Sequence, residues 1–273
     1  MSLPDSPGED VYTHGHHESV LRSHRWRTVE NSAGYLLDAF VPGARVLDVG
    51  CGPGTITVDV AARVTPGRVL GVDRADEVLE AARAAARDAG VDNVEFGVGD
   101  VYALELPDAS FDVVHAHQVL QHLTDPVRAL REMRRVCAPG GVVAARDSDY
   151  ATFTWWPEDP RLTRWLALYH DVARSNHAEP DAGRRLLAWA HAAGFADVVA
   201  TASVWCFASA EDRAWWGGMW SDRVVASAFA DQAVDRGLAT RTELEEISAA
   251  WRTWSESPDA WFAIVHGEIR AHP

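Results

Sequence analysis

The feature that most constrains this chain is a regular alternation, between residues 45 and 147, of short β-branched runs and longer Ala- and Arg-rich segments. Strands alternating with helical segments of this length are typical of βαβ units and of a parallel sheet. We therefore expect an α/β fold with strands over 45–49, 68–72, 93–97, 111–117 and 141–146. Between them the sequence predicts helices over about 54–63, 76–89 and 124–137, with Gly90 as a C-cap glycine.

The segments before and after this region have different patterns of apolar residues. Apolar residues at helical spacing between 18 and 40 predict one or two amphipathic helices. Beyond residue 150, where 11 of the 12 Trp lie, the pattern changes again. There we expect helices over 184–194, about 209–236 and 241–256, and strands over 197–207 and 261–270.

Composition excludes several classes of function. Forty Asp and Glu against 25 basic residues give a net charge of −15, which repels nucleic acid and anionic membranes. All basic residues are Arg, so mechanisms that need a lysine amine, such as a pyridoxal phosphate Schiff base or a P-loop, are excluded. Cys51, Cys137 and Cys206 form no CxxC pair or disulfide framework. No apolar run approaches the roughly 20 residues of a membrane span, and the acidic first residues differ from a signal peptide, so we expect a cytoplasmic protein.

A glycine-rich turn follows the first predicted strand, in the run VLDVGCGPGT that ends at Thr55. Glycines at such a turn let the backbone approach a ligand at the helix N-terminus and the carboxyl edge of the sheet. The dinucleotide pattern GxGxxG needs a glycine at 55, but the third glycine here is Gly54. The spacing therefore disfavours a nicotinamide-dependent oxidoreductase.

Acidic residues follow the next two predicted strands. Asp73 ends the second strand, where a carboxylate can accept hydrogen bonds from both hydroxyls of a ribose. Asp76 is the better helix cap, which leaves Asp73 for a ligand. Gly99-Asp100-Val101 follows the third strand.

In this order, the glycine turn, Asp73 and the Gly99–Val101 segment resemble the motifs of class I S-adenosylmethionine-dependent methyltransferases. Residues 45–147 are similar to the ubiquinone and menaquinone biosynthesis type. The resemblance implies a Rossmann-like class I methyltransferase fold, with a seven-stranded, mostly parallel sheet and helices on both faces. It implies S-adenosylmethionine as cofactor and S-adenosylhomocysteine as product, lying across the carboxyl ends of strands one to four. The expected binding residues are Tyr12, Asp48, Gly50, Cys51, Gly52, Gly54, Asp73, Arg74, Gly99, Asp100, Val101, His117 and Gln118.

This reading divides the chain into three parts. Residues 1–40 form an N-terminal helical lid segment and residues 41–150 the S-adenosylmethionine-binding core. Residues 151–273 complete the sheet and carry an aromatic-rich helical insertion, with Trp-rich substrate-cap helices at about 150–180 and 209–256.

His117 is the candidate catalytic residue, because it ends the fourth strand where the donor's methyl group should project. An imidazole there can take a phenol, enol or ring proton, and the alternative is that His117 only lines the site. Gln121 and His122 are weaker candidates, with capping or packing as the alternative role. Asp147 and Asp149 either face the pocket or are exposed loop carboxylates.

Two further clusters have competing interpretations. Tyr12, His14, His16, His17 and His24 resemble a set of metal ligands, but too few partners accompany them, and we expect no metal. The alternatives are a lid over the donor's carboxylate, to which Arg25 or Arg27 contributes, and a solvated leader. The late Trp residues serve either as core or as walls of an acceptor pocket, the candidates for walls being Trp155, Trp156, Trp216 and Trp220, with Trp155 and Trp156 the best placed.

We therefore expect an enzyme that transfers a methyl group from S-adenosylmethionine to carbon or oxygen of a small apolar or aromatic metabolite. The alternative is a non-catalytic sensor or scaffold of the same fold. The expected partner is a small-molecule substrate, with no nucleic acid and no membrane span. The sequence leaves open whether the chain forms a homodimer.

Overall fold

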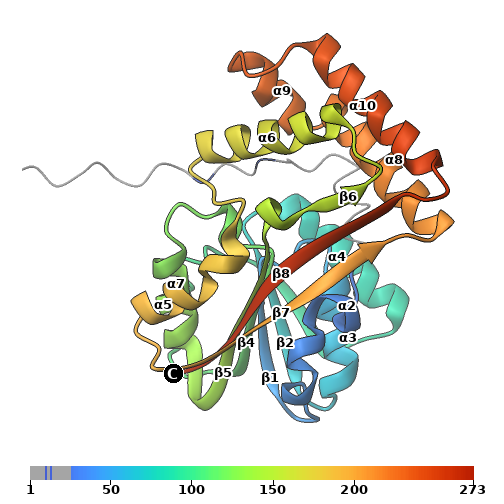
Figure 1. The fold of residues 1–273 in the computed structure, drawn as a ribbon. Coiled ribbons are helices and arrows are strands. Elements are labelled where there is room, and N and C mark those ends of the chain that lie inside the picture. The colour runs from blue at the N-terminus through green and yellow to red at the C-terminus, as the bar shows by residue number, and fades with distance from the viewer. Residues whose placement is uncertain (1–9, 11–12, 14–25) are drawn as a thin grey trace, which may run out of the picture.

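The computed structural model describes residues 10, 13 and 26–273, and the statements below concern these residues. One large sheet forms the centre of the molecule, with helices on both faces and a further helical layer beyond the carboxyl ends of its parallel strands (Figure 1). The strands are β1 (Arg45–Val49), β2 (Arg68–Asp73), β3 (Val94–Val98), β4 (Phe111–His117), β5 (Cys137–Ser148), β6 (Thr154–Trp156), β7 (Asp197–Phe207) and β8 (Trp261–His272).

The sheet contains the parallel strands that the alternating pattern predicts. Its order is β3-β2-β1-β4-β5-β8-β6, with β7 paired to β8. Strands β1 to β5 run parallel, whereas β8 runs antiparallel to β5, β6 and β7. The Rossmann-like, mostly parallel sheet is thus confirmed, and the short β6 adds an eighth strand to the seven expected.

The helices fall into three groups. Helices α2, α3 and α4 cover one face of the sheet together with the 3-10 helix η1, and α5 and α7 cover the other face. Helices α6, α8, α9 and α10 form the outer layer (Figure 1). The helix bounds are α2 (Val29–Ala33), η1 (Gly34–Ala39), α3 (Thr55–Val64), α4 (Asp76–Ala89), α5 (Pro126–Val136), α6 (Pro160–Ser175), α7 (Leu186–Ala192), α8 (Ala210–Ala226), α9 (Ala228–Asp235) and α10 (Arg241–Glu256). Three short 3-10 turns complete the list, η2 (Leu120–His122), η3 (Tyr150–Thr152) and η4 (Ala182–Arg185).

Local capping explains where several helices begin and end. Gly90 caps α4 with φ 67°, as its position predicts, and its N–H donates to the last carbonyls of the helix. Asp125 caps α5, so this helix begins at Pro126 rather than at 124. The single helix expected over 209–236 is two helices, because Ser227 adopts an extended backbone conformation between α8 and α9.

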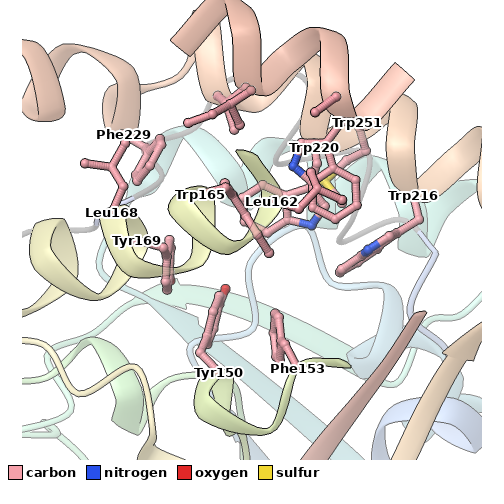
Figure 2. Close-up of a cluster of buried hydrophobic side chains, with 14 of the residues drawn as sticks. Tyr150, Phe153, Leu162, Trp165, Leu168, Tyr169, Trp216, Trp220, Phe229 and Trp251 are labelled. Carbon is pink, nitrogen blue, oxygen red and sulfur yellow. The ribbon is translucent and has the colours of Figure 1, made fainter. Parts of the chain in front are cut away.

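The outer helices enclose an aromatic core of their own. Trp165 lies at its centre, with its ring centroid 4.5 Å from that of Trp220 and 4.9 Å from that of Trp251. Figure 2 shows these rings with Tyr150, Phe153, Tyr169, Trp216 and Phe229 between the outer helices and the segment that follows β5. Most late Trp residues therefore pack against one another, and they stabilise the outer layer by removing large apolar surfaces from water.

Two carboxylates near the end of β5 are buried. The strand runs to Ser148, so Asp147 lies within it and is paired with Gly267 of β8. The carboxylate of Asp149 receives two 2.6 Å hydrogen bonds from the guanidinium of Arg184. Exposed loop positions for Asp147 and Asp149 are therefore wrong, and neither lines the main cavity.

The close packing of α3 against α4 can be tested at Gly54. It adopts φ 77° at the start of α3, and an added Cβ would lie 2.8 Å from the Cβ of Ala82 on α4. Gly54→Ala should therefore lower the free energy of unfolding by about 2–4 kcal/mol, the left-handed backbone and overpacking together. Gly90→Ala is the matched control, because Gly90 shares the positive φ but has open space around it, and should cost only about 1–2 kcal/mol. If urea denaturation showed the same loss of unfolding free energy for Gly54→Ala and Gly90→Ala, the packing explanation would be contradicted.

Asp147 gives a second test, based on pH. Burial raises the pKa of its carboxyl from 3.8 to about 8, so the folded state favours the protonated form. The stability that this group contributes is complete below its unfolded pKa and is lost as the pH rises toward about 8. Asp147→Asn cannot ionise, so its unfolding free energy should improve relative to the wild type between about pH 5 and pH 8. A difference independent of pH in urea denaturation would argue against a neutral Asp147.

Candidate functional site

A cavity of about 520 Å³ opens at the carboxyl ends of β1, β2 and β4. It gathers most of the residues that the sequence predicts for the site. The predicted residues that line it are Asp48, Gly50, Cys51, Gly52, Asp73, Arg74, Gly99, Asp100, Val101, His117 and Gln118. Gly54 does not line it and instead packs against α4 and β3, and Tyr12 lies outside the described residues.

The glycine turn is fixed by hydrogen bonds to the end of β2. The N–H groups of Gly50 and Cys51 both donate to the carbonyl of Val72, over 2.8 and 3.0 Å. Gly50 has φ 69°, and a Cβ there would lie 2.4 Å from Cγ2 of Val119. The turn therefore needs glycine at this position both for its conformation and for the close approach of Val119.

Asp73 connects the turn to the next helix. Its Oδ2 accepts from the N–H of Gly52 over 2.9 Å, and its Oδ1 accepts from the N–H of Ala75 over 3.0 Å. A carboxylate has about four lone-pair positions, so Asp73 retains acceptor capacity toward the cavity. Its position at the end of β2 is therefore set before any ligand binds.

Asp48 is buried beneath the turn and anchors it. Its Oδ2 accepts a 2.6 Å hydrogen bond from Thr57, at the start of α3, and its Oδ1 lies 3.3 Å from Nδ1 of His115 on β4. After β3, the carboxylate of Asp100 accepts a 2.9 Å hydrogen bond from the N–H of Tyr102. The neighbouring Val101 is partly buried against the hydrophobic core of the sheet. These carboxylates give one end of the cavity an acidic lining, which we call the donor end.

His117 is buried at the end of β4, beside the other end of the cavity. Its ring centroid lies 5.8 Å from that of Trp205 and 6.5 Å from that of His115. Neither ring nitrogen has a hydrogen-bond partner among the described residues. Burial, with the nearby charge of Arg27, lowers the pKa of His117 well below its usual range, so the imidazole is neutral at neutral pH.

Gln118 adopts a left-handed backbone conformation, with φ 54°, directly after β4. Its Oε1 accepts a 2.6 Å hydrogen bond from Nη2 of Arg27, and its Nε2 donates to Oγ of Ser148 over 2.9 Å. Nε2 also lies 3.0 Å from Nε2 of His266. Sequence reasoning considered Arg27 for the lid but missed its link to Gln118, which joins residues 91 positions apart.

Aromatic side chains form the second end of the cavity, which we call the acceptor end. Its apolar lining consists of Tyr150, Phe153, Trp205, Trp215, Trp216, Trp220 and Ile264. Of the four Trp residues proposed as walls, Trp216 and Trp220 are found here. Trp155 and Trp156 lie on β6 instead, outside the lining, and the side chain of Trp156 is 57% exposed.

Sequence reasoning missed Trp205 and Trp215 as walls. Alternation along β7 contained the signal for Trp205, since every second residue of a strand faces the same side.

Gln121 and His122 also line the cavity, and burial lowers the pKa of His122 to about 3.

Across residues 10, 13 and 26–273, no three His, Cys, Asp or Glu side chains lie close enough together to hold a metal ion. His14, His16, His17 and His24 lie outside these residues. No helix within the same residues is long and apolar enough to cross a membrane.

Comparison with known proteins gives the family. Residues 40–212 match a family model described as a methyltransferase domain. The chain is 36% identical to an uncharacterized methyltransferase of Schizosaccharomyces pombe, covering 94% of this chain and 95% of that protein. It is 30% identical to a probable methyltransferase of Aspergillus luteorubrus, over 95% and 96% of the two chains.

A solved structure supports the fold. The YcgJ protein from Bacillus subtilis superimposes with a TM-score of 0.58 at 22% identity, covering 89% of this chain and 98% of that chain. Together with the family match and the ordered motifs at the carboxyl edge of the sheet, these findings identify the enzyme class. The chain belongs to the methyltransferase domain family and is a class I S-adenosylmethionine-dependent methyltransferase.

Proposed function

We propose that the donor end holds S-adenosylmethionine and that the acceptor end holds a small apolar or aromatic metabolite, which is methylated on carbon or oxygen. The observation that carries this proposal is the cavity itself, which joins an acidic, glycine-lined end to an aromatic end. Ligands of open α/β sheets bind at the carboxyl ends of the strands, where this cavity lies.

The donor end fits an adenosyl amino acid. Asp73 retains lone pairs that can accept from both ribose hydroxyls. Asp100 can accept from the exocyclic amine of adenine, and Val101 offers an apolar surface to the ring. The positive φ of Gly50 and Gly52 keeps side chains away from the ligand's path along the turn.

The acceptor end supplies shape and excludes water. When bound, the donor supplies a sulfonium methyl group that is already activated for transfer. The chain's own task is then to orient the acceptor and to keep water out. Flat aromatic walls such as Trp205 and Trp216 suit a planar apolar molecule, because they bury its faces at little entropic cost.

We infer that His117 contributes as a hydrogen-bond acceptor or a wall rather than as a strong base. General bases are most effective when their pKa lies near the working pH. The lowered pKa of His117 leaves a neutral ring with little tendency to hold a proton.

Asp73 gives a direct test of the donor end. Asp73→Asn removes a negative acceptor from the ribose position, so the Kd for S-adenosylhomocysteine should rise roughly tenfold to hundredfold in calorimetry. Gly52→Arg should abolish binding by filling the turn. Asp92→Asn is the control, since Asp92 is exposed outside the cavity and its substitution makes the same change of charge. Equal affinity in the Asp73 and Asp92 variants would reject the placement of the ribose.

The acceptor class can be tested with donor that carries a labelled methyl group. Incubation with a bacterial metabolite extract should place the label in products that partition into an organic solvent and absorb as aromatic compounds. Trp216→Ala should reduce this labelling while leaving the Kd for S-adenosylhomocysteine unchanged, because Trp216 lines only the acceptor end. Label recovered solely in water-soluble amines would contradict the proposed acceptor class.

A further inference from the structure

We propose that the acceptor is an acidic hydroxyl compound, a phenol or an enol, that binds as its anion beside Arg27. This inference rests on the proposed function and deepens it, since it names the substrate class and assigns the residue that selects it. Its basis is the distribution of charge along the cavity and the way in which Arg27 is held.

The acidic side chains that line the cavity lie at one end, whereas arginines line both ends, with Arg74 beside Asp73 at the donor end. The carboxylates lie at the donor end or next to it, and they are Asp10, Asp48, Asp73, Asp76, Glu77 and Asp100. Asp10 belongs to this group because its Oδ1 accepts from the N–H of Thr124 and from the hydroxyl of Tyr102. At the acceptor end, the described lining residues include no carboxylate, and the charged side chains there are Arg27 and Arg223.

Neighbouring contacts place Arg27 at the acceptor end. The ring of the preceding residue, Trp26, has its centroid 5.0 Å from that of Trp205 and 5.2 Å from that of Trp215. Both of these rings line the acceptor end. The guanidinium therefore lies between the aromatic walls and the end of β4.

Gln118 holds the guanidinium of Arg27 in position. The 2.6 Å hydrogen bond from Arg27 reaches a side chain that is itself fixed by Ser148 of β5 and His266 of β8. The N–H of Gln118 also donates to the carbonyl of Arg146 over 2.7 Å, which secures its left-handed backbone. A residue kept in a disfavoured conformation by several contacts is typical of functional sites.

The titratable groups around this position favour an anion over a base. The histidines facing it from β4, η2 and β8 are His117, His122 and His266, and burial together with the charge of Arg27 lowers the pKa of each. Arg146 of β5 adds a second positive charge, offset by Glu268 at 3.3 Å. The charge of Arg27 also acts on the carboxyl of Asp147 of β5, whose pKa burial raises to about 8, so that this group is largely neutral at neutral pH. Neutral imidazoles of low pKa are poor proton acceptors, whereas the same positive field stabilises a phenolate or enolate.

Methyl transfer to such an anion then needs no protein side chain as a general base. The acceptor loses its proton to water as it binds. The electron pair of the anion forms the new bond to the methyl carbon, while the carbon–sulfur bond of the donor breaks and its electron pair goes to sulfur. A positive donor and a negative acceptor thus give two neutral centres.

The experiment uses 4-nitrophenol, whose phenol and phenolate absorb at different wavelengths. The full-length protein, saturated with S-adenosylhomocysteine, is titrated with 4-nitrophenol across a range of pH. We expect the bound probe to ionise about one to three pH units below the free probe, as beside other opposite charges. Arg27→Met should abolish this shift, Arg27→Lys should retain most of it, and Arg68→Met, at a side chain 81% exposed, should leave it unchanged.

4-Nitroanisole, which cannot ionise, separates the role of charge from that of packing. Its Kd should be the same for the wild type and Arg27→Met, whereas the Kd for 4-nitrophenol should rise in the variant. Bound 4-nitrophenol that ionises as in free solution, or no binding of 4-nitrophenol at all, would overturn the inference. Failure of S-adenosylhomocysteine to bind would instead overturn the proposed function. The ionisation of bound and free 4-nitrophenol is compared on the wild-type protein. The inference is therefore tested even if Arg27→Met does not fold.

Discussion

The structure depends on the connection between the glycine turn and the end of β2. Gly50 and Cys51 donate to Val72, and Gly52 donates to Asp73, so the turn is fixed by backbone hydrogen bonds. This connection keeps the start of α3 and the edge of β2 at a constant separation. Because donors and acceptors are paired within the protein, the site is organised before a ligand enters, which reduces the entropic cost of binding.

The outer aromatic layer provides both stability and a wall for the cavity. Trp165 and Trp251 are fully buried in its core, whereas Trp216 and Trp220 belong to that core and also line the acceptor end. The wall is therefore rigid, because its rings are packed on the side away from the cavity. We expect substitutions at Trp216 to affect both the acceptor end and the stability of the outer layer, and substitutions at Trp165, which does not line the cavity, to affect the fold.

Local patterns predicted the core of the enzyme well. The five parallel strands, the cap at Gly90 and the cluster of glycines and carboxylates at the sheet edge all follow from residue spacing over short distances. Long-range features were less accessible. The link from Arg27 to Gln118 spans 91 positions, and no periodicity reports it.

The errors have the same origin. Trp155 and Trp156 follow β5 in sequence, but pairing of β6 with β8 turns them away from the cavity. The burial of Asp147 depends on the length of β5 and on its partner β8, neither of which a single segment reveals. A Ser at 227 is compatible with a helix interior, and only the tertiary arrangement of α8 and α9 separates the two helices.

A crystal structure of the enzyme with S-adenosylhomocysteine would test the central claim most directly. The account predicts the ribose hydroxyls within hydrogen-bond distance of the Asp73 carboxylate, the adenine beside Val101, and the sulfur pointing toward Gln118 and the aromatic walls. Product bound elsewhere, or a ribose with no contact to Asp73, would contradict it.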